Sequence, residues 1–187
     1  MSEYQYYEFC KIDKPLSAEA RKEMHSLSSR AKVGTHGASY EYNYGDFKGK
    51  PKALLLKYFD VFFYISNWGT VQLMFRYPAG TVDFLMLKKH QIKHIIECEQ
   101  VNDQIVLDIT LNNEDGFGWT EGEEVLSDLL PLYDAVKTDA TRFLELVTAI
   151  HDELSGETEG SFKTTMKKLA PLSAAEKALI KNIGMEN

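Results

Sequence analysis

The chain has 187 residues, of which 44% are hydrophobic, 12% aromatic and 26% charged, which is close to average globular usage. This composition excludes intrinsically disordered, collagen-like and coiled-coil proteins, and the length suffices for a core without disulfides or metals. Asp and Glu number 28 against 21 Lys and Arg, and the formal net charge of −7 argues against nucleic acid and anionic membranes as partners. We expect residues 1–187 to form a single α+β domain.

The sequence contains no segment typical of export or membrane insertion. The N-terminus carries acidic side chains and no apolar stretch of the kind found in signal peptides. The apolar segment 53–68 is interrupted by Lys57 and Asp60, so it is too short to span a membrane. Cys10 and Cys98 form no Cys-x-x-Cys pair and are typical of reduced core residues. The sequence therefore predicts a cytoplasmic protein without a transmembrane helix.

The first part of the chain predicts alternating strands and helices. An aromatic-rich strand is expected over residues 6–12, and a helix capped by Ser17 follows to about Ser29. The alternation in 39–44 predicts a strand whose tyrosines share one face and pack across the sheet. A broad apolar band from Pro51 to near Asn67 predicts a long core helix.

The second part of the chain predicts several strands and then helices. A polar turn at Asn102-Asp103 indicates a hairpin, and Ser173 and Glu176 match a capping box. The expected elements are strands at 71–77, 83–89, 93–99 and 104–111, helices at 125–130, 138–154 and from Ser173, and a polar linker at 155–165. This order favours an α+β fold with a mixed, mostly antiparallel sheet and helices packed on it, and parallel pairing of the first three strands remains open.

Several stretches resemble a family of bacterial proteins of unassigned function. They are Tyr7-Glu8-Phe9, Ile12-Asp13-Lys14-Pro15-Leu16-Ser17, Tyr44-Gly45-Asp46-Phe47-Lys48-Gly49 and Asn67-Trp68-Gly69-Thr70, with Trp119-Thr120-Glu121-Gly122 further on. The resemblance covers most of the chain and implies no activity. Because members of the family continue with helical, charged sequence, it also implies that the chain is the N-terminal part of a longer protein.

Motifs for catalysis or metal binding are weak. Gly-x-Ser-x-Gly, Ser-x-x-Lys together with its companion motifs, and glycine-rich phosphate loops are absent from the sequence. His90 and His94 have the i, i+4 spacing of a metal pair on a helix, but the neighbouring lysines favour a solvated basic patch. Residues 113–124 match part of a calcium loop, yet Asn113 replaces the first carboxylate, which favours a solvated acidic loop or a rim for a basic partner. We predict no catalytic residue, metal or cofactor.

Aromatic and charged loop residues indicate a binding surface. Our main hypothesis is a non-catalytic module that binds a protein partner. The alternative is a small-ligand-binding domain or an enzyme, with a site near Asp46 and Trp68 at one end of the sheet, and whether the protein is an enzyme remains open. The candidate binding residues are Asp46, Lys48, Trp68, Arg76, Trp119 and Glu121.

Overall fold

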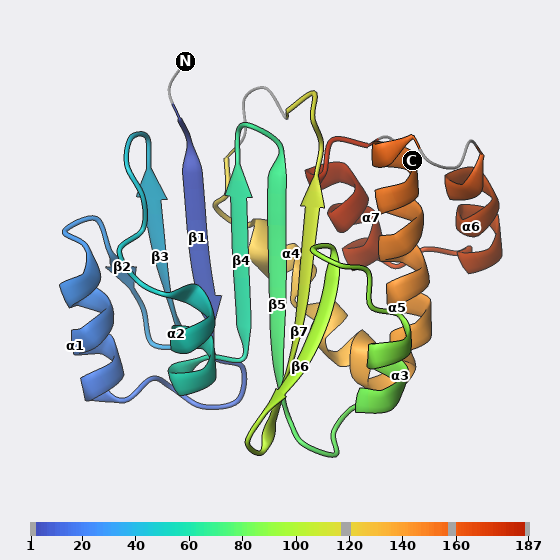
Figure 1. The fold of residues 1–187 in the computed structure, drawn as a ribbon. Coiled ribbons are helices and arrows are strands. Elements are labelled where there is room, and N and C mark those ends of the chain that lie inside the picture. The colour runs from blue at the N-terminus through green and yellow to red at the C-terminus, as the bar shows by residue number, and fades with distance from the viewer. Residues whose placement is uncertain (1–2, 117–120, 157–159, 186–187) are drawn as a thin grey trace.

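The computed structural model describes residues 3–116, 121–156 and 160–185. Within these residues, seven strands form one sheet in the order β2-β3-β1-β4-β5-β7-β6 (Figure 1). The strands are β1 (Gln5–Cys10), β2 (Lys32–Val33), β3 (Gly37–Tyr42), β4 (Val61–Ser66), β5 (Thr70–Pro78), β6 (Ile96–Val101) and β7 (Gln104–Asn112). The helices are α1 (Ala18–Leu27), α2 (Pro51–Tyr58), α3 (Phe84–Lys89), α4 (Val125–Leu129), α5 (Pro131–Ser155), α6 (Ser161–Leu169) and α7 (Ala174–Asn182). The predicted α+β class is confirmed.

All pairings among the described strands are antiparallel. β1 pairs with β3 on one side and with β4 on the other, so the first strands of the chain do not pair in parallel. The β6–β7 hairpin forms as predicted, and Leu107 and Ile109 are buried on its inner face. Among the described residues, no helix combines the length and the apolar character that crossing a membrane requires.

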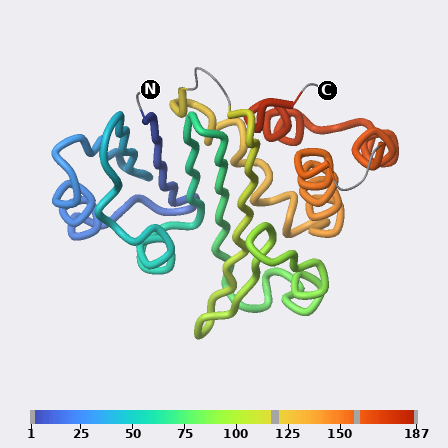
Figure 2. Tube along the Cα trace, turned by 45° about the horizontal axis from the view of Figure 1, so that its top comes forward, coloured from blue at the N-terminus to red at the C-terminus, as the bar shows by residue number. Residues whose placement is uncertain are grey.

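The helices cover the two faces of the sheet diagonally (Figures 1 and 2). On one face, α1 and α2 pack over β1, β3 and β4 in a first hydrophobic cluster that includes Phe9 and Leu55. On the opposite face, α4, α5 and α7 pack over β4, β5 and β7 in a second cluster that includes Phe75 and Ile180. Each helical layer therefore covers mainly one half of the sheet. The half that is covered on one face is the half that is left uncovered on the other.

Strand β4 belongs to both clusters. Its alternation sends Phe62 to the first cluster and Phe63 to the second, and both side chains are fully buried. A strand buried on both faces is a continuous apolar run, which periodicity cannot distinguish from a buried helix. The predicted core helix from Pro51 to near Asn67 is therefore wrong, because its second part is β4.

Asp60 stands at the break between α2 and β4. Its N–H donates to the carbonyl of Cys10 at 2.9 Å, which extends the β1–β4 pairing by one residue. Its carboxylate accepts a hydrogen bond from the Ile12 N–H at 2.9 Å and forms an ion pair with Arg76. These contacts hold the chain extended immediately after the C-cap Phe59 and end the helix there.

Two further expectations are corrected by local contacts. The segment predicted as a strand at 83–89 is α3, because the Asp83 side chain caps it by accepting a hydrogen bond from the Met86 N–H at 3.0 Å. The predicted linker 155–165 is interrupted by α6, which buries Phe162 and Leu169 and packs against α5.

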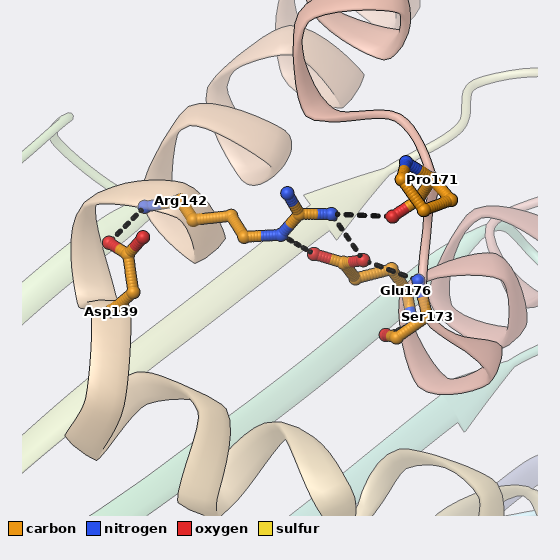
Figure 3. A network of polar contacts seen from close by, with 5 residues as sticks. All are labelled: Asp139, Arg142, Pro171, Ser173 and Glu176. Atoms are coloured by element: carbon orange, nitrogen blue, oxygen red, sulfur yellow. Dashed lines mark hydrogen bonds and ion pairs between the residues drawn. The ribbon is translucent and has the colours of Figure 1, made fainter.

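Helices α5 and α7 are joined by a polar network (Figure 3). The predicted capping box is present, because the Ser173 hydroxyl accepts from the Glu176 N–H and the Glu176 carboxylate accepts from the Ser173 N–H at 2.7 Å. Arg142 binds the same carboxylate through two nitrogens, at 2.7 and 2.9 Å. Asp139 has non-helical backbone angles that divide α5, and its side chain accepts from the Arg142 N–H at 3.0 Å. This link fixes α7 against the second part of α5.

On each face of the sheet, the half that is not covered by helices carries polar side chains. On the face of α1 and α2, alternation along β5 and β7 places Gln72 and Asp108. On the opposite face, alternation along β1 places Glu8, which is partly buried and accepts a hydrogen bond from the Tyr6 hydroxyl at 3.3 Å. Each face of the sheet therefore carries a partly buried carboxylate, Asp108 on the face of α1 and α2 and Glu8 on the other.

Replacing Glu8 by Gln is expected to stabilise the protein at neutral pH. Burial raises the pKa of the Glu8 carboxyl, and the Tyr6 hydrogen bond only partly opposes this effect. An acid with a raised folded pKa binds more protons when folded, so its contribution to stability falls as the pH rises from the unfolded towards the folded pKa. Calorimetry should show a higher Tm for Glu8→Gln at pH 7 and little change at about pH 3, where both states are protonated. A lower Tm at pH 7 would contradict this account.

Candidate interaction edge

Two exposed aromatic side chains stand at one end of the sheet, on either side of β1. Gln5, the first residue of β1, pairs with Tyr42 of β3 and with Ser66 of β4. Tyr44 and Trp68 each follow these partners by two residues, and they are 71% and 47% exposed. The register therefore places both residues beyond the end of the sheet where β1 begins, which is the end near the N-terminus in Figure 1.

The loop after β3 separates its aromatic side chains. β3 ends at Tyr42, so the prediction that Tyr44 packs across the sheet with Tyr40 and Tyr42 is wrong for Tyr44. Phe47 turns inward instead, and its ring centroid lies 4.6 Å from that of Tyr40 and 5.1 Å from that of Tyr7. The buried Phe47 anchors the loop, while Tyr44 remains in contact with solvent.

The buried amide of Gln5 fixes the position of this loop. Its nitrogen donates to the carbonyl of Gly45 at 3.1 Å and to Oδ1 of Asp46 at 3.3 Å. Its oxygen accepts from the hydroxyls of Tyr7 at 2.6 Å and Tyr64 at 3.2 Å. The hydrogen bond from the Gln5 amide holds the Asp46 carboxylate in place, and the Asp46 side chain remains exposed to solvent.

The turn that carries Trp68 is fixed by the segment after β7. Gly69 has a positive φ of 99°, and its carbonyl accepts a hydrogen bond from the Asn113 N–H at 2.8 Å. The Asn113 side-chain amide donates to the carbonyl of Ile183, the C-cap residue of α7, at 3.1 Å. Helix α7 thus braces the turn that presents Trp68.

Exposed carboxylates lie on segments that are hydrogen-bonded to this end of the sheet. Glu114 and Asp115 follow Asn113 directly. Glu121 precedes Gly122, whose N–H donates to the Tyr4 hydroxyl at 2.8 Å beside the start of β1. We call this surface the interaction edge, and define it by Tyr44, Asp46, Trp68, Glu114, Asp115 and Glu121.

The structure brings only part of the predicted site together. Asp46, Trp68 and Glu121 lie at the interaction edge, and Lys48 is exposed in the loop of Asp46. Arg76 lies towards the other end of β5, roughly 20 Å from its first residue at 3.3 Å per residue, and pairs with Asp60. The predicted ligand site that joins Arg76 to Asp46 and Trp68 is therefore not assembled.

In the part of the chain that the structure describes, the cysteines and histidines with reactive side chains are not arranged as a catalytic or metal site. Cys10 lines a cavity of about 550 Å³ with His36, but burial raises the pKa of its thiol to about 11, so the nucleophilic thiolate is disfavoured at neutral pH. His90 ends α3, and His94 lies in a turn with a φ of 67°, so they do not share a helix face. Within the described ranges, no group of three His, Cys, Asp or Glu residues is arranged to hold a metal ion.

Sequence reasoning missed Gln5, Tyr44 and the carboxylates of Glu114 and Asp115 as parts of one surface. The only signal for Gln5 was a glutamine within an aromatic-rich strand, and its burial could not be read from the sequence. Trp119, also predicted to bind, lies outside the described residues. Neither the models of protein families nor the curated proteins compared with this sequence match it. The interaction edge is therefore the feature of the structure that bears on function.

Proposed function

We propose that the protein is a non-catalytic interaction module that binds a basic segment of a partner protein through the interaction edge. The observation that carries this proposal is the exposure of Tyr44 and Trp68, at 71% and 47%, on either side of β1 among exposed carboxylates. Aromatic side chains are enriched in the energetically dominant parts of interfaces, and surrounding charges select a partner of opposite sign.

The edge is preorganised for binding. Both aromatic side chains stand on turns that are hydrogen-bonded to the rest of the fold, through Gln5 in one case and Asn113 in the other. Tyr and Trp have few rotatable bonds, so their immobilisation in a complex costs little entropy. Preorganised contacts of this kind give higher affinity for the same contact area.

The double substitution Tyr44→Ala/Trp68→Ala is expected to weaken partner binding by at least about 30-fold, which is the loss of about 2 kcal/mol expected for a single hot-spot aromatic. The partner would be captured from lysate on the immobilised chain, identified by mass spectrometry, purified and titrated by calorimetry. Leu85→Ala is the matched control, because Leu85 is also 71% exposed but lies on α3. The control variant should bind like the unsubstituted chain.

Salt dependence tests the charge of the partner. Raising the salt from about 0.1 M to about 1 M shortens the Debye length from about 10 Å to about 3 Å and should weaken the complex strongly. Equal affinity of the double variant and the Leu85 variant would disprove binding at this edge. A partner whose affinity does not change with salt would disprove recognition of a basic segment.

A further inference from the structure

Helix α6 is a strongly basic element of an otherwise acidic protein. The range 161–182, which contains α6 and α7, holds five of the 21 basic residues but one of the 28 acidic residues. That acidic residue, Glu176, is already bound by Arg142. α6 itself contains three lysines and no Asp or Glu. A basic helix is therefore set against the formal net charge of −7 that the whole chain carries.

The lysines of α6 are placed unfavourably for an isolated helix. Lys163 is the third residue of α6, where its charge lies near the positive end of the helix dipole. Lys167 lies four residues further along, so these two like charges share one face and repel each other. Both side chains are exposed, and among the described residues neither forms an ion pair, whereas Lys168 Nζ lies 2.6 Å from Glu145 Oε1. An anionic partner on this face would relieve both unfavourable effects.

The basic face of α6 lies far from the interaction edge of its own chain. α6 packs against α5. Figures 1 and 2 show it as the outermost element beyond α5, at the opposite end of the molecule from β1 and β3. A single chain therefore does not bring its α6 and its interaction edge together, and each surface can meet another molecule.

We propose that α6 is the basic segment that the interaction edge binds, so that the partner is a second copy of this chain. This inference rests on the function proposed above and names the partner. Lys163 and Lys167 face the exposed carboxylates of the edge, such as Asp46. The ring faces of Tyr44 and Trp68 also attract ammonium groups, and both side chains are exposed.

The two surfaces also match in size. β1 separates β3 from β4, so the strands that lead to Tyr44 and Trp68 lie two strand spacings apart, roughly 10 Å. This is about the diameter of one helix. Because the edge and α6 are different surfaces, the contact between copies is head-to-tail. The net charge of −7 on every copy opposes the contact, so the association should be weak.

Sedimentation velocity with two complementary variants tests this contact. Lys163→Glu/Lys167→Glu, the α6 variant, retains the edge, and Tyr44→Ala/Trp68→Ala, the edge variant, retains α6. At about 0.05 M salt, the average mass of the unsubstituted chain should rise between about 0.01 and about 1 mM. Each variant alone should associate at least about tenfold more weakly. An equimolar mixture of the two variants should form a one-to-one complex, because one intact surface of each kind remains.

Lys14→Glu/Lys22→Glu is the matched control for the α6 variant. It makes the same change in net charge at exposed lysines before and within α1, and it should associate clearly more strongly than the α6 variant. The α6 variant should remain folded, because Glu is favourable in the first turn of a helix. The inference is overturned if the unsubstituted chain stays monomeric up to about 1 mM, if the control loses as much association as the α6 variant, or if the mixture forms no complex.

Failure of this inference can be told apart from failure of the proposed function. If the chain stays monomeric but captures another protein from lysate, and the edge variant does not capture it, the edge binds a different basic segment and this inference alone fails. If the edge variant associates as well as the unsubstituted chain, α6 does not bind the edge. If neither self-association nor capture from lysate depends on Tyr44 and Trp68, the proposed function itself fails.

Discussion

Replacing Arg142 by Leu should lower the free energy of unfolding by about 3 kcal/mol, because it leaves a buried carboxylate without its cation. Glu176 is only 5% exposed, and Arg142 binds both of its oxygens and also donates to the Pro171 carbonyl at 3.2 Å (Figure 3). Arg142 is itself partly exposed, so the effect lies at the lower end of the range for buried pairs. For a chain of this length, Tm should fall by roughly 6–12 °C.

The double variant Arg142→Leu/Glu176→Gln distinguishes the loss of the ion pair from the cost of leaving the Glu176 carboxylate buried without a cation. It should recover much of the lost stability, because Gln still accepts from the Ser173 N–H and carries no charge. Urea unfolding of both single variants and of the double variant gives the coupling energy. Independent effects that simply add would show that the pair does not hold α7 on α5.

The same link should weaken in acid. Burial raises the pKa of Glu176, but Arg142 and the Ser173 N–H outweigh this effect and hold the pKa below its usual value. A lowered pKa contributes stability above the unfolded pKa and loses it as the pH falls through the folded value. The difference between Arg142→Leu and the unsubstituted chain should therefore shrink at low pH.

Replacing Gly69 by Ala should cost more than about 3 kcal/mol, because the position requires both a positive φ and the absence of a side chain. A left-handed conformation costs a non-glycine residue about 1–2 kcal/mol. In addition, a Cβ at this position would lie 1.9 Å from the Asn113 carbonyl oxygen. The two segments would have to separate, which breaks the hydrogen bond from the Asn113 N–H to Gly69.

Gly80→Ala is the matched control for this substitution. Gly80 also has a positive φ, of 86°, but a Cβ there would have no neighbour within 4 Å. It should therefore cost only the backbone term of about 1–2 kcal/mol. Equal losses for the two variants in urea unfolding would show that contact with Asn113 does not constrain the turn of Trp68.

Elements governed by local rules could be predicted from the sequence. The alternation of β7 and the polar turn before it define the β6–β7 hairpin, and the Ser173–Glu176 capping box defines the start of α7. The prediction of a long core helix failed because the sequence of a strand buried on both faces, such as β4, shows no alternation of apolar and polar residues. The strand expected at 83–89 failed because the cap at Asp83 was not recognised.

The candidate site could be predicted only in part, because its assembly depends on long-range pairing. Asp46 and Trp68 stood out as a charged and an aromatic residue in glycine-containing loops. Their position at one end of the sheet follows from the pairing of Gln5 with Tyr42 and Ser66, which no local pattern reveals. Arg76 was misplaced for the same reason, since its partner Asp60 depends on where β4 begins.

The position of β1 couples the two layers of helices during folding. β1 is the first strand in the chain, yet it lies between β3 and β4 and contributes Phe9 to one cluster and Tyr6 to the other. Its pairing of Gln5 with Ser66 closes a loop of about 60 residues, and this entropy loss precedes most of the stabilising contacts. During synthesis, neither cluster can be completed until β4 has emerged. The two halves of the molecule therefore have no boundary at which one could be separated from the other and keep its core.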